Sequence, residues 1–165
     1  MKLVRYGEPG AERPGQVESG GQKRDQSGVI DDLDGAQLSP ERLAALRGLN
    51  HLELPQVAGT PRLGCPVAEV GKIVAVGLNY SDHAAEAGMK VPSEPILFMK
   101  ATSAIVGPND DVQIPPGSQK TDWEVELAFV IGRTAKYVPE AEALDYVAGY
   151  CVCHDVSERA FQTER

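Results

Sequence analysis

Three acidic side chains are spaced as the ligands of a metal ion could be. Glu124 and Glu126 lie in the apolar segment 122–131, and Asp155 ends a second apolar segment, 150–155. If 122–131 is a strand, Glu124 and Glu126 project from one face, because side chains alternate with a period of two. Carboxylates on one face repel unless water or a hard cation such as Mg²⁺ or Mn²⁺ lies between them. A solvated strand face, and a helix cap at Asp155, explain the same residues without a metal.

A histidine and a glutamate form a second candidate pair. His83 and Glu86 are three residues apart in the segment 82–87, which we expect to form a short helix that ends at Gly88. At this spacing the two side chains share a helix face. A carboxylate beside an imidazole raises its pKa and orients it, which suits general-base action on a bound water. An ordinary surface pair has the same spacing, so both interpretations stay open.

Short strands dominate the elements that must position these residues. Apolar runs with many β-branched residues predict strands at 2–6, 72–77, 96–99, 123–131 and 149–154. Ser39 as a cap, Pro40 at the first turn and Gly48 at the end predict one helix between them. Further helical segments are expected at 140–147 and from residue 155 onward. The many short strands favour an α+β, mainly β architecture.

Two stretches rich in glycine and proline divide the chain. The segment 7–21 predicts turns, and 54–66 predicts a connector. The apolar character of the chain increases after Pro66. We therefore expect a small N-terminal module at 1–66 and a second domain at 67–165.

The composition narrows the class of protein. With 42% hydrophobic and 24% charged residues the chain is globular, and a net charge of −8 argues against a nucleic-acid partner. No apolar run approaches the length of a membrane span, so no membrane partner is expected. The three cysteines, Cys65, Cys151 and Cys153, lack the pattern of a structural zinc site. They are interpreted as small buried hydrophobes of a reduced, cytoplasmic protein.

Four ordered motifs resemble the fumarylacetoacetate hydrolase family. Residues 72–86 are similar to its strand and "GxNYxxH" loop, and 94–107 to its "PxxFxK" segment. Residues 122–131 match its "D-x-E-x-E-L-A" strand, and 155–162 its "ND-x-(S/T)-x-R-x-x-Q" segment, with His154 where the family has Asn. The resemblance extends over 64–165 and is more specific than any single motif.

This resemblance implies a fold and a set of site residues. The fold would be an incomplete mixed β-roll with a small N-terminal α/β module and a Mg²⁺ or Mn²⁺ ion. Three sets of positions carry over by motif: Glu124, Glu126 and Asp155 as metal ligands; His83 and Glu86 as the catalytic dyad; and Lys100, Arg159 and Gln162 as substrate-binding residues.

The resemblance also implies an activity. The expected enzyme is a metal-dependent hydrolase that cleaves a C–C bond in an acylpyruvate or 2,4-dioxo acid, with a small 2-oxo acid as its partner and a homodimer as its full-length form. A 2-oxo acid decarboxylase, an isomerase or lyase of the same family, or a non-catalytic family fragment are alternatives. Family members continue to a "W-x-x-x-K" segment that is absent here, so we expect a C-terminally truncated chain that needs more sequence for activity.

Overall fold

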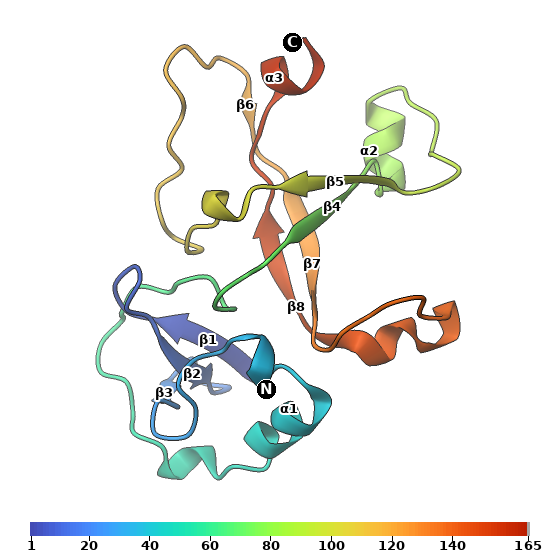
Figure 1. Ribbon diagram of the computed structural model, residues 1–165. Coiled ribbons are helices and arrows are strands. Elements are labelled where there is room, and N and C mark those ends of the chain that lie inside the picture. The colour runs from blue at the N-terminus through green and yellow to red at the C-terminus, as the bar shows by residue number, and fades with distance from the viewer. Residues whose placement is uncertain (165) are drawn as a thin grey trace. The chain divides into compact units, whose positions relative to one another are not determined.

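The structure, a computed structural model that describes residues 1–164, divides into two compact units. The first unit joins Met1–Ala68 to Gly107–Arg165, and the second is Glu69–Val106. Strands outnumber α-helices, so the expected α+β, mainly β class is confirmed (Figure 1). Among the described residues, no helix has the length and apolar character needed to cross a bilayer.

A three-stranded sheet and one helix build the start of the first unit. The elements are β1 (Lys2–Tyr6), β2 (Arg13–Val17), β3 (Lys23–Asp25), the 3₁₀ turns η1 (Gly35–Gln37) and η2 (His51–Glu53), and α1 (Pro40–Arg47). The sheet is antiparallel throughout, in the order β1-β2-β3. The buried cluster of Ile30, Leu33 and Leu46, with Leu3 packed against it, joins α1 to β1. The hydrophobic core of this unit therefore lies within its first 68 residues.

Local sequence signals explain α1. The Ser39 hydroxyl accepts a hydrogen bond from the Arg42 amide, Pro40 occupies the first turn, and Gly48 caps the end, as expected. The turn expected over 7–21 is wrong in part, because β2 lies inside it. Pro14 is tolerated there because pairing with β3 begins only at Gly15, and the Pro14 carbonyl accepts from the Gln26 amide.

A bidentate ion pair ties β1 to the loop before α1. Arg5 donates from Nε and Nη2 to the two carboxylate oxygens of Asp32, at 2.7 and 2.8 Å, and the Leu33 amide also donates to Asp32. Burial alone would raise the pKa of Asp32, but the hydrogen bonds from Arg5 and Leu33 outweigh it and lower that pKa. The pair is mostly enclosed, so its loss leaves a charged partner poorly solvated.

Asp32→Asn is expected to lower the free energy of unfolding by about 2 kcal/mol at neutral pH. A carboxyl whose folded-state pKa is lowered stabilises the fold above its unfolded pKa of about 4, and this contribution is lost as pH falls through the folded pKa. The difference in the free energy of unfolding between wild type and Asp32→Asn should therefore shrink in acid. Urea unfolding at several pH values measures it. Asp31→Asn is the control, because Asp31 is exposed; an equal loss in both variants would contradict the assignment.

The second half of the first unit carries the acidic motifs. Its elements are β6 (Thr121–Asp122), β7 (Val125–Ile131), the 3₁₀ helix η4 (Glu140–Tyr146), β8 (Val147–His154), β9 (Ser157–Glu158) and α3 (Arg159–Thr163). β7 pairs with β8 and β6 pairs with β9, both antiparallel. The helix expected at 140–147 is 3₁₀ rather than α, and the helix expected from residue 155 begins only after β9. Gly132 is required after β7, because a Cβ there would lie 2.4 Å from the Leu38 carbonyl oxygen.

One face of the β7–β8 ladder is apolar and open. The opposed pairs Leu127 and Val152, and Phe129 and Tyr150, are all exposed. The other face, which carries Glu126, is half-buried. Within the described part of 107–165, no apolar residue is fully buried. The strands of the candidate site therefore lack a core of their own.

The second unit is a hairpin with one short helix. Its elements are β4 (Ile73–Gly77), α2 (Ser81–Glu86), β5 (Ile96–Lys100) and η3 (Thr102–Ala104), with β4 and β5 antiparallel. These strands and α2 agree with the sequence-based expectation. Leu78 has φ of 51°, a left-handed conformation that is unusual for a non-glycine residue and lies in the turn between β4 and α2.

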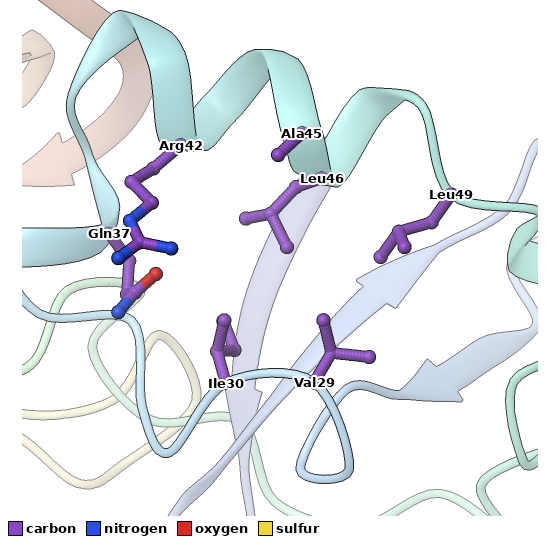
Figure 2. Close-up of a pocket in the computed structure, with 7 residues that line it drawn as sticks. All are labelled: Val29, Ile30, Gln37, Arg42, Ala45, Leu46 and Leu49. Carbon is purple, nitrogen blue, oxygen red and sulfur yellow. The ribbon is translucent and has the colours of Figure 1, made fainter.

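Two small pockets of the first unit lie away from the acidic motifs. One, of about 90 Å³, lies beneath α1, with Arg42 and Gln37 at one end and aliphatic side chains at the other (Figure 2). A second, of about 190 Å³, lies between α1 and the end of η4. Both are smaller than the ~300 Å³ typical of ligand sites. Neither is lined by a residue that the sequence analysis assigned to the site.

Candidate functional site

The three predicted metal ligands share one face of the β7–β8 ladder. Glu126 pairs with Cys153, and the Asp155 amide donates to the Glu124 carbonyl at 2.8 Å, which extends the ladder by one rung. Directly opposed residues have Cβ atoms about 4.5–5.5 Å apart. Glu124 and Asp155 are opposed in this way, and Glu126 follows Glu124 on the same face. Antiparallel pairing thus groups carboxylates that are about thirty residues apart in sequence.

Arg159 is the cation that this face holds. Its Nη2 donates to Glu124 Oε1 at 2.5 Å, and its Nε donates to Asp122 Oδ2 at 2.9 Å. Nη1 donates to Gln162 Oε1 at 2.8 Å. Burial works against the charge, but the hydrogen bonds to Glu124 and then Asp122 outweigh it and raise the pKa of Arg159. Arg159 and Gln162, both predicted to bind substrate, are therefore in contact with each other, and Arg159 also contacts the predicted metal ligand Glu124.

Short strands hold Arg159 in place. β9 pairs with β6, so Ser157 lies opposite Asp122 and the chain enters α3 next to the acidic face. The Arg159 amide donates to the Lys120 carbonyl at 2.9 Å. Glu158 accepts from the Ser118 and Thr121 hydroxyls, and the Ser118 bond, the larger influence, lowers the pKa of Glu158. This network fixes the start of α3 against β6.

The donor types on this face fit a hard cation, whereas their present side-chain positions do not form a cage. Glu126 is half-buried, and within residues 1–164 its side chain makes no hydrogen bond or ion pair. One oxygen of Asp155, Oδ1, is buried. As they stand, however, no three His, Cys, Asp or Glu side chains in the described chain are grouped closely enough to hold a metal. Glu124 is turned to Arg159, and the metal site stays a prediction.

Two cysteines lie on the strand that carries the acidic face. Cys151 and Cys153 lie on the same face of β8, opposite Ala128 and Glu126. Partial desolvation by neighbouring residues, and then the carboxylate of Asp155, raise the pKa of the Cys153 thiol. All three cysteines are free, as expected. Cys65 and Cys151 are half-buried and Cys153 is exposed, so the interpretation of the three as buried residues is wrong. The charged donors on this face are oxygens.

The predicted dyad belongs to the second unit. His83 and Glu86 lie on α2, and both are exposed. No hydrogen bond or ion pair joins their side chains in the part of the chain that the structure describes, although their helix spacing is as predicted. Lys100, at the end of β5, is half-buried with Nζ 6.0 Å from the centre of the Phe98 ring. The roles of these three residues stay predictions.

Two residues of the acidic face escaped the sequence analysis. Asp122 anchors Arg159, and the Ser157 hydroxyl donates to Glu124 Oε2 at 3.4 Å. Both contacts join segments more than thirty residues apart, and no local pattern predicts such pairs. Asp122 does open the "D-x-E-x-E" motif, which is the one signal that could have indicated it.

Comparison with known proteins places this arrangement of strands in a known enzyme family. The profile of the fumarylacetoacetate (FAA) hydrolase C-terminal family matches residues 72–165. Two curated relatives, from Burkholderia multivorans and Burkholderia cenocepacia, are each 59% identical over 165 residues, which is the whole chain and 58% of each relative. Each is named only as a "putative hydrolase".

Solved structures agree with the sequence match. A fumarylacetoacetate hydrolase from Exiguobacterium antarcticum has a TM-score of 0.77 at 30% identity, over 99% of this chain and 58% of that one. A 5-carboxymethyl-2-hydroxymuconate delta-isomerase from Mycobacterium smegmatis has a TM-score of 0.67 at 30% identity, over 99% of this chain and 57% of that one. The chain belongs to the fumarylacetoacetate hydrolase family and spans somewhat more than half the length of these relatives.

Proposed function

We propose that the protein is a divalent-metal-dependent enzyme that cleaves a C–C bond in a small 2-oxo acid, such as an acylpyruvate or 2,4-dioxo acid. The observation that carries this proposal is the face of the β7–β8 ladder that groups Glu124, Glu126 and Asp155. Family membership supports it, because the family includes hydrolases and isomerases. The half-buried carboxylate of Glu126 supports it further, since such a group favours a nearby cation.

Glu124, Glu126 and Asp155 would hold Mg²⁺ or Mn²⁺, whose preference for oxygen ligands they match. The bound ion would supply Lewis acidity at the keto oxygen of the substrate, where negative charge develops as the C–C bond breaks. Arg159 and Lys100 supply positive charge for the substrate carboxylate, which a chain with a net charge of −8 would otherwise repel. Gln162 adds a neutral amide that can orient the same group.

The proton transfer is assigned to His83. Its neutral imidazole would accept a proton from the water that attacks the carbonyl carbon, and Glu86 would stabilise the imidazolium that forms. A proton must then reach the carbon that leaves, and the same imidazolium can return it. In this proposal Glu86 orients His83 without touching the substrate.

An isomerase is the second candidate. Three of the solved relatives are named as isomerases, one at 30% and two at 28% identity. In that reaction a proton moves from one atom of a dienol to another, and no water is consumed. His83 would then transfer a proton within the substrate, whereas the acidic face and Arg159 keep the same roles.

One experiment separates these activities. The purified chain is incubated with Mn²⁺ and either an acylpyruvate or a 2-hydroxy-dienoate, and bond cleavage and tautomerisation are followed by ultraviolet absorbance. We expect cleavage that stops with a chelator and returns with Mn²⁺. His83→Gln should lower kcat by about 100-fold or more, whereas His51→Gln, in η2, should not change it.

Tautomerisation without cleavage would replace the hydrolase assignment by the isomerase. No turnover of either substrate, together with no binding of Mn²⁺, would indicate a non-catalytic family member. Activity that survives removal of all divalent metal would overturn the proposed chemistry.

A further inference from the structure

The guanidinium of Arg159 connects a predicted metal ligand, Glu124, with a predicted substrate-binding residue, Gln162. Asp122 Oδ2 accepts from Nε at 2.9 Å and lies 2.8 Å from Nη2, Glu124 Oε1 accepts from Nη2 at 2.5 Å, and Gln162 Oε1 accepts from Nη1. Asp122 and Glu124 are joined through one planar group. Such a fork is geometrically specific to arginine, because lysine presents a single ammonium.

The contact with Glu124 conflicts with cation binding at the same carboxylate. A divalent ion ligated by Glu124 would lie beside a positive guanidinium and would be repelled by it. The conflict cannot be avoided by solvent screening alone, because the side chains of Arg159 and Glu124 are only 27% and 20% exposed. An ion that takes Oε1 of Glu124 must therefore displace Nη2, and this exchange changes the position of Arg159.

The arrangement also determines where Arg159 goes after such an exchange. Asp122 holds Nε and is not among the predicted metal ligands, so it can retain the arginine after Glu124 turns away. Gln162 lies one turn along α3 and holds Nη1. The freed Nη2 would then remain next to the acidic face with an unused donor.

We propose, resting on the proposed function, that Arg159 is an internal counter-cation of Glu124 that a divalent metal ion displaces, which frees its guanidinium for an anionic ligand. Metal and anion binding are then coupled through one side chain. Each ligand raises the affinity for the other by the same factor, because such coupling is reciprocal. Asp122 is a positioning residue in this scheme and touches neither ligand.

The first test is a calorimetric titration of the 165-residue chain with Mn²⁺. Arg159→Gln should bind Mn²⁺ roughly three- to tenfold more tightly than wild type, because the ion no longer displaces a partner of Glu124. Arg159→Lys keeps the positive charge but loses the fork, and it should also bind more tightly than wild type. Repulsion by charge alone would leave Arg159→Lys at wild-type affinity, which would overturn the displacement mechanism. Arg42→Gln, an exposed arginine on α1, is the control for charge removal elsewhere.

The second test observes Arg159 directly and needs no variant to gain affinity. The Nε–H resonance of Arg159, assigned by its absence from Arg159→Lys, is followed by NMR during a titration with diamagnetic Mg²⁺. Displacement predicts a shift that saturates with the dissociation constant that calorimetry gives for Mg²⁺. An unchanged resonance while Mg²⁺ binds would overturn the proposal.

The outcomes for the two proposals differ. Binding of Mn²⁺ to wild type with no gain in either Arg159 variant overturns the displacement and leaves the metal site standing. Absence of Mn²⁺ binding in wild type and in all variants overturns the metal site of the proposed function, and the displacement with it. Thermal melts followed by circular dichroism show whether each variant is folded before it is titrated.

Discussion

Replacing Glu126 with glutamine is expected to weaken Mn²⁺ binding by about 100-fold or more, because even partners of metal ligands contribute 10–100-fold to affinity. Glu126 is the half-buried carboxylate of the acidic face whose side chain has no hydrogen bond or ion pair in residues 1–164. A neutral amide keeps its shape but removes the charge that attracts the ion. The same substitution should stabilise the metal-free chain slightly, since it removes repulsion from Glu124 and Asp155.

Glu126→Gln should thus weaken Mn²⁺ binding but stabilise the metal-free chain. A general loss of folding would not produce this combination. Calorimetry measures the affinity, and thermal melts with and without Mn²⁺ measure the stability. Glu142→Gln, on the exposed surface of η4, is the matched control and should change neither. Equal Mn²⁺ affinity in Glu126→Gln and wild type would remove Glu126 from the proposed site.

The second large effect is expected on the self-association of the chain. The open face of the β7–β8 ladder presents Leu127, Phe129, Tyr150 and Val152 to solvent, and Leu127 is 63% exposed. Burial of such surface contributes roughly 25 cal/mol per Å², and an open apolar face favours pairing with another chain. We expect the 165-residue chain to sediment as a dimer or larger species at micromolar concentration.

Leu127→Lys should shift this equilibrium toward the monomer, because it places a charge on the apolar face without removing a buried contact. Leu144→Lys is the control, since Leu144 is also exposed, at 75%, but lies on η4, outside the ladder. Sedimentation velocity of the three chains measures the difference. A wild-type monomer that melts in one cooperative transition above about 50 °C would contradict the expectation.

The parts of the fold that sequence predicted are those whose signals are local. Ser39, Pro40 and Gly48 specify both ends of α1 within ten residues. The alternation of 123–131 correctly separated the face of Glu124 and Glu126 from that of Trp123 and Leu127. β2 was missed because Pro14 and Gly15 resemble turn residues, and only pairing with β1 makes them a strand.

In the candidate site, too, sequence predicted what depends on local signals and missed what depends on long-range contacts. The acidic residues could be chosen from alternation and motif, and their common face follows from the register of β7 and β8. The contact of Arg159 with Glu124 depends on β9 returning beside β6, which no spacing in the sequence predicts. Sequence therefore identified the three acidic residues and Arg159, whereas Asp122, Ser157 and the mutual contacts of this face required the structure.

The confinement of the core cluster to the first 68 residues has a consequence for synthesis of the protein. The cluster of Ile30, Leu33 and Leu46 is complete once these residues have left the ribosome. A proximal nucleus of this kind can form during translation, before β7 and β8 exist, because contacts close in sequence cost little chain entropy. The later link from Arg62 to Asp110, at 2.7 Å, would then dock the nascent segment after residue 107 onto a surface that is already ordered.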